Sequence, residues 1–218
     1  MTADQVWALV PVKRFAAAKT RLAHLLTPSE RARLARAMLT DVLDVLAACT
    51  RISGTLVVTE DADAAQVAEA FAAQILREER ECGLNAAVER GLRALHHAHA
   101  VVILPADLPC LSTDEIDQAI AALDSSPLVL VPASRDGGTN LIAARPPSVA
   151  EPAFGEASFV RHVDRARYRG VEPCILRLPG AGHDVDRPED LVGVSSAANP
   201  ATAALIRTLA SKVFAHHA

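Results

Sequence analysis

Short apolar runs alternate with amphipathic stretches through most of this sequence, and this alternation most constrains the fold that it can adopt. The run 100–104 (AVVIL) is wholly apolar, as expected for a central parallel strand buried on both faces. Strands separated by helices predict an α/β fold, in which helices cover both faces of one mainly parallel central sheet. The predicted strands are 6–12, 54–59, 100–104, 128–132, 140–144 and 172–178. One long helix is predicted to begin at the capping box of Thr27 and Glu30, and others near 62–73, 84–95, 113–123, 156–168, 187–193 and 200–215.

The length of 218 residues suits a single domain, since chains usually divide only beyond roughly 250–300 residues. We therefore expect one domain over 1–218, with a core at about 6–193 and a C-terminal helix at about 200–215. A net charge of −4 argues against a general nucleic-acid binder. The sequence has no apolar run of about 18 residues, no secretory signal pattern and no CxxC pair, which predicts no membrane span and a reduced, cytoplasmic location.

A basic loop follows the first predicted strand and precedes the Thr27 helix. Its four cations are Lys13, Arg14, Lys19 and Arg21. A nucleoside triphosphate carries about four negative charges, and Lys and Arg side chains offset the charge that builds on a leaving pyrophosphate. An ordinary solvated loop is the alternative interpretation. Neither a Walker P-loop nor a GxGxxG motif occurs, which removes the usual support for ATPases and dinucleotide oxidoreductases.

Carboxylates follow two other predicted strands. Asp107 lies in LPADLP after the most apolar strand, and Asp184 and Asp186 point to the same side of the extended segment GHDVDRPEDL. Mg²⁺ is commonly held by one or two carboxylates together with phosphate oxygens. These residues are therefore candidate metal ligands. Alternatively, Asp107 could cap the next turn, and Asp186 could cap a helix that begins at Pro188.

Three glycine-containing turns offer further binding groups at the ends of predicted elements. Gly83 opens a predicted helix and leaves amides accessible, while the side chain of Asn85 can pair with a base or ribose. The turns 136–140 and 154–158 combine glycines with hydroxyl and amide side chains. Each of the three could equally be a plain turn or a helix cap. A zinc site is not expected at the histidines that lack an HExxH spacing, which are His96, His97 and His99.

Taken in order, seven segments of the chain resemble one known family. VPVK, AKTRL, GLNAAVERG, LPADLP, GGTN, FGEASF and DVDRPEDL are similar to the phospholactate/phosphoenolpyruvate guanylyltransferases, which act in biosynthesis of the deazaflavin coenzyme F-420. The resemblance runs from about residue 6 to residue 193. It implies a single Rossmann-like nucleotidyltransferase domain of the glycosyltransferase-A type. It also implies transfer of GMP from GTP to a small phosphorylated acid, with release of pyrophosphate.

The resemblance also implies roles for particular residues and partners. The triphosphate would be held by Lys13, Lys19 and Arg21, which with Asp107 form the catalytic set, and the guanosine part by Gly83 and Asn85. Mg²⁺ would be bound by Asp107 and Asp186, with Asp184 available to a second ion, and the acceptor would lie near Thr139, Asn140, Gly155 and Ser158. A downstream transferase that consumes the labile product is a further expected partner. The resemblance favours a homodimer, although the apolar C-terminal helix could pack on its own core or on a second subunit.

Two positions depart from the family pattern, and the identity of the acceptor is therefore not decided by the sequence. Many relatives have threonine where Asn140 stands and Thr-Pro where Arg187-Pro188 stands. Phosphoenolpyruvate, 2-phospho-L-lactate and 3-phospho-D-glycerate each offer one phosphate and one carboxylate. An enzyme for another acceptor, such as molybdopterin, is one alternative, although this chain begins with VPVKRFAAAKTRL rather than the glycine-rich loop usual there. A non-catalytic nucleotide-binding module on the same fold is the other.

Overall fold

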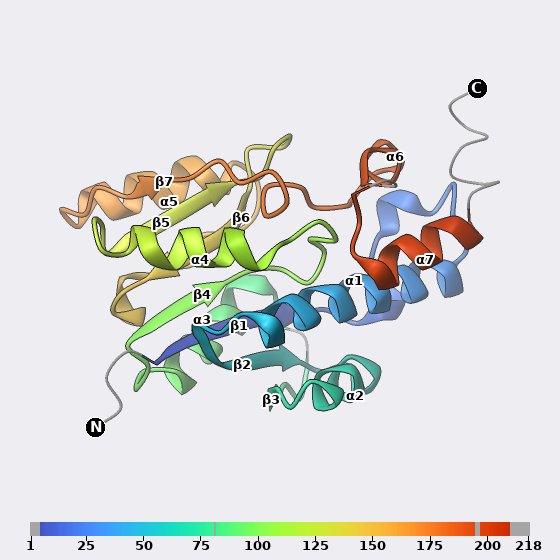
Figure 1. The fold of residues 1–218 in the computed structure, drawn as a ribbon, viewed down its shortest axis with the longest axis horizontal. Coiled ribbons are helices and arrows are strands. Elements are labelled where there is room, and N and C mark those ends of the chain that lie inside the picture. Colours follow the sequence, from blue (N-terminus) through green and yellow to red (C-terminus); the bar gives the residue numbers. More distant parts are fainter. Residues whose placement is uncertain (1–4, 81, 195–196, 210–218) are drawn as a thin grey trace.

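A mainly parallel sheet forms the centre of the computed structural model, which describes residues 5–80, 82–194 and 197–209. Its strands are β1 (Val6–Val12), β2 (Ile52–Thr59), β3 (Gln74–Arg77), β4 (Ala100–Ile103), β5 (Leu128–Pro132), β6 (Thr139–Ala144) and β7 (Cys174–Ile175). They lie in the order β3-β2-β1-β4-β6-β5-β7 (Figure 1). Only β6 runs antiparallel to its neighbours β4 and β5 among the described strands. The predicted α/β fold is confirmed.

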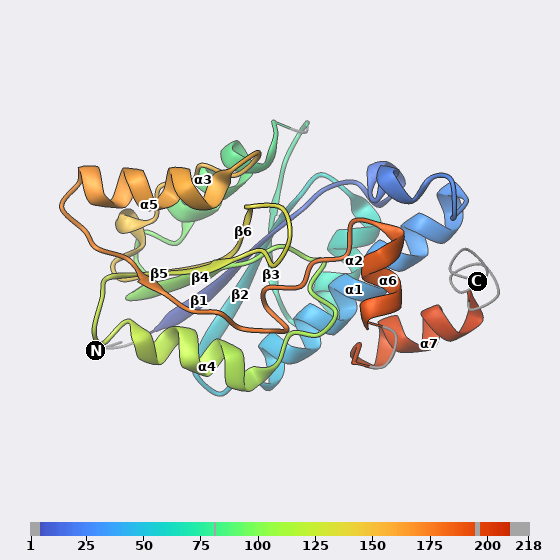
Figure 2. The same ribbon diagram turned by 90° about the horizontal axis from the view of Figure 1, so that it is seen from above.

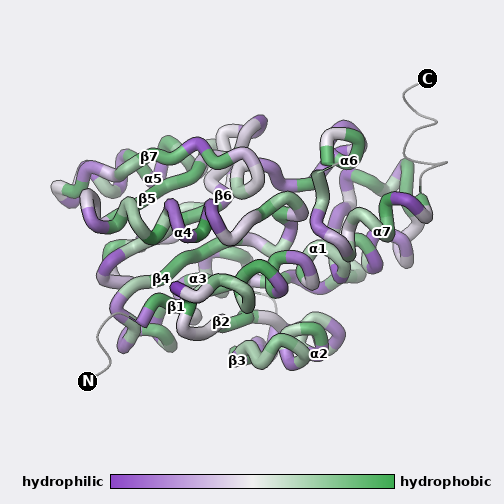
Figure 3. Tube along the Cα trace, viewed as in Figure 1, coloured by the Kyte–Doolittle hydropathy of each residue, from purple (hydrophilic) through white to green (hydrophobic). Residues whose placement is uncertain are grey.

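The side chains of the strands form two hydrophobic layers, one on each face of the sheet, because successive residues of a strand point to opposite faces. Ala8 and Val10 of β1 pack with α1 (Pro28–Ala48), α2 (Ala62–Ala70) and α4 (Thr113–Ala122). On the opposite face, Leu9 packs with residues of α3 (Leu84–Ala94) and α5 (Ser158–Tyr168). Figure 2 shows α3 and α5 above the sheet and α1 and α4 below it. Figure 3 shows that the most hydrophobic segments run along the central strands.

The N-terminus of α1 has the predicted capping box. The Thr27 hydroxyl accepts a hydrogen bond from the Glu30 amide at 3.3 Å, and the Glu30 carboxylate accepts one from the Thr27 amide at 2.8 Å. Pro28 occupies the first helical position, where a missing N–H costs no hydrogen bond. This cap fixes the point at which the basic loop ends.

The C-terminal helix packs on its own chain over the described residues. Helix α7 (Pro200–Thr208) follows α6 (Pro188–Val194), and Leu205 and Ile206 are buried in a cluster with Leu34 and Met38 of α1. The predicted helix extended to about 215, but residues 210–218 lie outside the described part. The buried Asp41 carboxylate accepts hydrogen bonds from the first amides of α7, and so docks α7 on α1. Among the described helices, none has both the length and the apolar character needed to cross a membrane.

Three differences between the predicted elements and the structure have a clear physical reason. Strand β3 was not predicted, because its four residues follow α2 closely and none of them is buried. The strand expected at 172–178 forms ladder pairs only at Cys174–Ile175. Pro173, which has no N–H to donate, limits its start. Helix α5 begins at Ser158 rather than at 156, because Ala157 adopts a left-handed conformation with φ 49°.

Candidate active site

The candidate active site lies where the carboxyl ends of β1 and β4 meet. These strands are parallel neighbours, so the loops 13–27 and 104–112 leave the same end of the sheet. The segment before α6 joins them there, as Figure 2 shows for α6 and the N-terminal loop. The Val185 amide donates a hydrogen bond to the Asp107 carbonyl at 3.2 Å. Two segments that are distant in sequence are therefore held side by side by their main chains.

The basic loop is fixed at both ends and turns one lysine inward. It forms two short 3-10 turns, Phe15–Ala17 and Thr20–Leu22, and the side chains of Phe15 and Leu22 are buried. Lys19, between the turns, has φ 53° and ψ 41°, a left-handed conformation that is uncommon for a residue with a side chain. Its side chain is only 7% exposed. A strained backbone that buries a lysine indicates a functional constraint rather than a solvated loop.

Lys19 bridges the two carboxylates that the sequence marks as metal ligands. Its ammonium contacts Asp107 Oδ2 and lies 3.0 Å from Asp186 Oδ1. Arg21 reaches the same cluster, with its guanidinium 3.0 Å from Asp186 Oδ2. The structure thus brings together the predicted residues of three separate loops.

The charges of this cluster shift the pKa values of its members. Burial alone would lower the pKa of Lys19, but the negative charges of Asp107 and Asp186 outweigh burial and raise it above the usual value. Burial alone would raise the pKa of Asp186, yet Lys19, with Arg21 and Lys13, lowers it below the usual range. The lysine is therefore cationic and Asp186 anionic at neutral pH.

Asp184 lies close to the same charges, but no ion pair joins it to a cation of the described residues. Burial, with the negative charge of Asp107, raises the pKa of Asp184 to about 6. Its Oδ1 accepts a hydrogen bond from the Asn140 side chain at 3.1 Å. A carboxylate whose charge is disfavoured in this way would gain from an added cation.

The donor set fits a divalent cation held partly by a ligand. Asp107 Oδ1 is buried and has no hydrogen-bond partner among the described residues. Asp107 and Asp186 already share one cation, the ammonium of Lys19. Over the described part of the chain, no group of three or more His, Cys, Asp or Glu side chains is arranged to hold a metal ion alone. Two carboxylates with further oxygens supplied by a phosphate are the usual ligands of Mg²⁺.

A cavity of about 390 Å³ borders this cluster on the side of the basic loop. Its wall includes Lys13, Lys19 and Asp107 together with Ala35 and Met38 of α1. A smaller hollow beside it is lined by Lys13 and Gly83. Gly83 has φ 86°, and no atom of a described residue other than its chain neighbours lies within 4 Å of the position that a Cβ would occupy. The side of Gly83 on which a Cβ would lie is therefore open, and its use by a ligand stays a prediction.

The side chain of Asn85 has a different environment from the one expected. Its amide nitrogen donates to the Phe154 carbonyl at 3.1 Å, and its oxygen accepts from the Phe154 amide at 2.7 Å. Both groups that could read a base are thus engaged with main chain. The described structure gives Asn85 a linking role, which ties the start of α3 to the segment before α5.

Three of the four predicted acceptor residues build a turn pair. The Thr139 amide donates to the Ser158 hydroxyl at 2.9 Å, and the Thr139 hydroxyl bonds His162 Nδ1 at 2.9 Å. Thr139 and Ser158 are both buried, so their hydroxyl groups serve internal contacts. Gly155 has φ 121°, which only glycine adopts readily, and so allows the sharp turn before α5. The fourth residue, Asn140, points to the other side of β6 and contacts Asp184.

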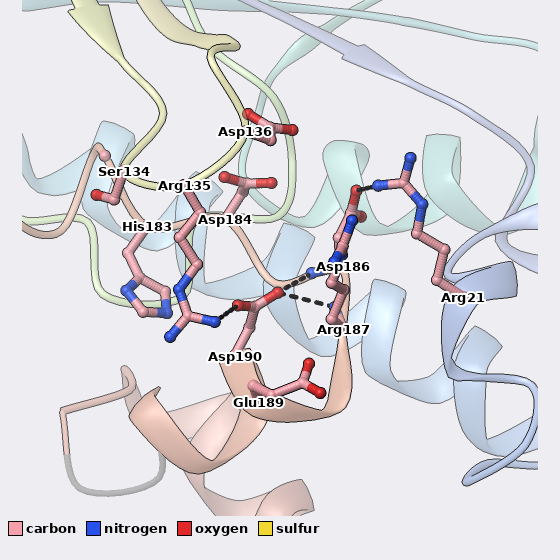
Figure 4. A pocket seen from close by; sticks show the side chains of 11 residues that line it. Arg21, Ser134, Arg135, Asp136, His183, Asp184, Asp186, Arg187, Glu189 and Asp190 are labelled. Carbon is pink, nitrogen blue, oxygen red and sulfur yellow. Dashed lines mark hydrogen bonds and ion pairs between the residues drawn. The ribbon is translucent and has the colours of Figure 1, made fainter. Parts of the chain in front are cut away.

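A second cavity, of about 370 Å³, shares Arg21 and Asp186 with the first. The turn 134–136 and the segment 182–190 form the rest of its lining, as Figure 4 shows. Arginine and carboxylate side chains from both segments are directed toward one another there. This cavity was not predicted from the sequence.

Asp190 organises the wall of this second cavity. Its Oδ2 accepts hydrogen bonds from the amides of Asp186 at 3.0 Å and Arg187 at 2.8 Å. Its Oδ1 lies 3.1 Å from the guanidinium of Arg135. The signal for Asp190 was present in the sequence, because an acidic residue in the first turn of a helix can bind the preceding amides. Arg135, a single charged residue in a turn, gave no comparable signal.

Comparisons with curated proteins find similar guanylyltransferases. The curated 3-phospho-D-glycerate guanylyltransferase of Phenylobacterium zucineum is 40% identical, over 86% of this chain and 88% of that protein. The phosphoenolpyruvate guanylyltransferase of Sphaerobacter thermophilus is also 40% identical, over 84% and 89%. The 2-phospho-L-lactate guanylyltransferase of Methanothermobacter thermautotrophicus is 36% identical, over 84% and 81%.

Solved structures show the same fold at lower sequence identity. A protein from Desulfovibrio desulfuricans G20, assigned to the nucleotide-diphospho-sugar transferases, superposes with a TM-score of 0.76 at 21% identity, covering 95% of this chain and 96% of that one. The 4-diphosphocytidyl-2C-methyl-D-erythritol synthase of Anaerococcus prevotii gives a TM-score of 0.63 at 12% identity, over 93% and 96%. The family described as "Guanylyl transferase CofC like" matches residues 6–213. The chain therefore belongs to the CofC-like guanylyltransferase family.

Proposed function

We propose that this chain is a Mg²⁺-dependent, cytoplasmic guanylyltransferase that transfers GMP from GTP to a small phosphorylated acid in coenzyme F-420 biosynthesis. The observation that supports it most directly is the contact of Lys19 with both Asp107 and Asp186, between two cavities. One cavity has the lysines suited to a triphosphate, and the other is available to the acceptor. A reaction between two phosphorylated substrates needs such an arrangement.

The proposed reaction is a single displacement at phosphorus. A phosphate oxygen of the acceptor forms a bond to the α-phosphorus of GTP, and the bond from that phosphorus to the bridging oxygen of the leaving group breaks. Pyrophosphate leaves with the electron pair. The acceptor phosphate has a second pKa of about 6 and is already ionised at neutral pH, so no general base is required.

The residues of the cluster have complementary roles in this proposal. Lys13, Lys19 and Arg21 offset the charge that develops on the leaving pyrophosphate. Asp107 and Asp186 would hold Mg²⁺, and Asp184 next to them would be available to a second ion. Bound Mg²⁺ would neutralise phosphate charge and keep the reacting groups in line. The open main chain at Gly83 receives the nucleoside, and Asn140 and Asp184 lie beside the acceptor phosphate.

The names of the relatives support the proposed class of acceptor. Proteins of similar identity to this chain are named for 3-phospho-D-glycerate, phosphoenolpyruvate and 2-phospho-L-lactate. These acids share a phosphate and a carboxylate, and that pair defines the class that we propose. The product is a diphosphate diester, so a downstream transferase that breaks this bond is the expected consumer. The apolar face of α7 is covered by α1 of the same chain over the described residues, and therefore gives no support to a homodimer.

A pyrophosphate-release panel tests the proposal. Purified protein with Mg²⁺ would be combined with GTP, ATP, CTP or UTP and with each of the three phospho-acids. We expect release with GTP and at least one acid, and none without an acceptor. Binding of GTP without pyrophosphate release under every condition would instead identify a non-catalytic module.

A further inference from the structure

The two carboxylates proposed to hold Mg²⁺ come from segments that no strand pairing joins. Asp107 lies in the loop 104–112 after β4, and Asp186 lies in the segment 176–187 after β7. The separation of the two carboxylates therefore depends on the contacts between these segments. Mg²⁺ tolerates little variation in that separation, because it demands a nearly octahedral arrangement of oxygens at about 2.1 Å.

Glu115, near the start of α4, connects the two segments through its side chain. Its Oε1 accepts a hydrogen bond from the Gly180 amide at 2.6 Å. Its Oε2 accepts hydrogen bonds from the Ser112 amide at 3.2 Å and from the Ser112 hydroxyl at 3.3 Å. Gly180 belongs to the segment that carries Asp186, and Ser112 ends the loop that carries Asp107. A single carboxylate thus binds both segments at once.

The main chains of the two segments approach each other closely at this link. A Cβ on Gly180 would overlap the carbonyl oxygen of Cys110, so a side chain at this position would force the segments apart. Further along, the Val185 amide donates to the Asp107 carbonyl at 3.2 Å. The Glu115 link and this main-chain bond together fix how the chain before Asp186 lies against Asp107.

The Glu115 side chain is buried more deeply than helix capping requires. Glu115 is 7% exposed, whereas the capping box of Thr27 and Glu30 at α1 makes its hydrogen bonds at the surface. A hydrogen bond from an amide to a buried carboxylate is stronger than one between neutral groups. Removal of the carboxylate would leave the Gly180 amide without this acceptor. Glu115 therefore has a role in addition to the start of α4.

We propose that Glu115 is a positioning residue that holds Asp186 at the distance from Asp107 that Mg²⁺ requires, an assignment that rests on the proposed function. Glu115 lines neither cavity, so it acts through the two segments and not on the substrates. Its loss weakens Mg²⁺ binding about tenfold or more, as for other groups that orient metal ligands.

A binding experiment without turnover tests the assignment. The ligand is a GTP analogue with a methylene group between its α- and β-phosphorus atoms, which cannot release pyrophosphate. Calorimetry gives its Kd in EDTA and in Mg²⁺, and the ratio of the first value to the second measures the coupling of nucleotide to metal. Glu115→Ala should reduce this ratio about tenfold or more and leave the Kd in EDTA within about twofold. Glu115→Gln keeps one acceptor oxygen for the Gly180 amide and should lose less.

Pyrophosphate release gives a second measurement. In Glu115→Ala the Mg²⁺ concentration for the half-maximal rate should rise about tenfold or more, and most of the rate should return at saturating Mg²⁺. If the alanine variant does not fold, Glu115→Asp decides by the same two measurements. Its carboxylate keeps the charge but is one CH2 shorter and cannot reach both Ser112 and Gly180. An unchanged ratio in the variant that folds would overturn the assignment.

Ser112→Ala is the matched control, since it removes the hydroxyl that caps α4 and keeps the contact of Glu115 with Gly180. Ser126→Ala is a second control, because it removes a buried hydroxyl that bonds the Glu172 carbonyl before the start of β5. Both variants should have lower melting temperatures and the same response to Mg²⁺ as the unchanged protein. A loss of coupling in either control as large as in Glu115→Ala would show that stability alone is measured, and would also overturn the assignment.

The two measurements separate this assignment from the proposed function. Coupling of the analogue to Mg²⁺ without any pyrophosphate release by the unchanged protein would overturn the proposed function, and the coupling ratio would then decide on Glu115. No coupling in the unchanged protein would overturn the assignment of Glu115, since no metal geometry would exist for it to set.

Discussion

The side chain of Asn85 and the main chain of Phe154 are 69 residues apart in sequence and are joined by two hydrogen bonds, of 3.1 and 2.7 Å. A pair of this kind makes a long-range link between the start of α3 and the turn before α5. One lone pair of the Asn85 oxygen and one N–H of its amide group are used in this link, which leaves fewer groups for a base. Asn85 can therefore be a structural link or a residue that reads the base, and the two roles predict different effects of its replacement.

Replacement of Asn85 by alanine should therefore lower stability and leave base selection unchanged. Loss of two part-buried hydrogen bonds should reduce the free energy of unfolding by about 1–3 kcal/mol. Urea denaturation measures this loss, and Gln118→Ala, an exposed amide on α4, is the control. The ratio of kcat/KM for GTP to that for ATP should stay the same. A large fall in that ratio, with little change in stability, would show that Asn85 reads guanine.

Lys19→Met tests the ammonium shared by Asp107 and Asp186. The substitution keeps most of the side-chain volume and removes the charge that faces both carboxylates and the leaving group. Pyrophosphate release should slow by on the order of a hundredfold or more. Lys19→Arg keeps the charge in a larger group and should retain more activity. A methionine variant within about threefold of the unchanged protein would contradict the role of Lys19.

Asp107→Asn tests the metal assignment. It preserves shape but removes one of the two charges proposed to hold Mg²⁺, so the rate should fall on the order of a thousandfold. Chelation by EDTA should abolish pyrophosphate release by the unchanged protein, and added Mg²⁺ should restore it. The variant should need far more Mg²⁺ for its residual rate. Asp114→Asn, an exposed carboxylate in the first turn of α4, should respond to Mg²⁺ as the unchanged protein does.

The main elements of the fold could be predicted because buried segments have a recognisable pattern of apolar residues. β4 is apolar at every position, and its four residues are buried. The meeting of Lys19, Asp107 and Asp186 could be predicted as well, because parallel strands deliver their loops to one end of the sheet. β3 was not predicted, because an edge strand of four residues buries too few side chains to give an apolar pattern.

The region in which a side chain lies could be predicted more easily than the group to which it bonds. Thr139 and Ser158 lie in glycine-containing turns as expected, but the sequence does not show that their polar groups bond to each other and to His162. A hydroxyl in such a turn can serve a ligand or the protein, and only the packing of α5 against β6 decides. The ion pair of Arg135 with Asp190 depends likewise on two loops whose relative position no local pattern encodes.

Asp41→Ala should detach α7 from α1. The Asp41 carboxylate accepts hydrogen bonds from Ala201 at 2.9 Å and Thr202 at 2.8 Å, and it is buried. Its removal leaves two helix N-terminal amides without an acceptor, which should cost about 1–3 kcal/mol of unfolding free energy. Asp44→Ala, at an exposed position of the same helix, is the control. Equal melting temperatures of the two variants would show that apolar contacts alone hold α7 in place.

His162 should make the stability of the protein depend on pH. Its Nε2 accepts a hydrogen bond from the Ala153 amide at 2.9 Å, so the ring proton is on Nδ1 and is donated to Thr139. Burial first, and then the positive charges of Arg165 and Arg161, lower the pKa of His162 from 6.5 to about 4. The unfolded chain therefore binds a proton at a higher pH than the folded chain does. The stabilisation is fully present above the unfolded pKa and is lost as the pH falls toward the folded one.

His162→Gln removes this titration and isolates its contribution. Urea denaturation of both proteins would be measured at about pH 7.5 and about pH 5, and other titrating groups cancel when the variant's change is subtracted. The unchanged protein should lose about 2 kcal/mol more than the variant over this interval, since each pH unit below the unfolded pKa costs about 1.4 kcal/mol. An equal loss in the two proteins would mean that His162 is protonated in the folded state at about pH 5, and that Ala153 does not donate to its ring there.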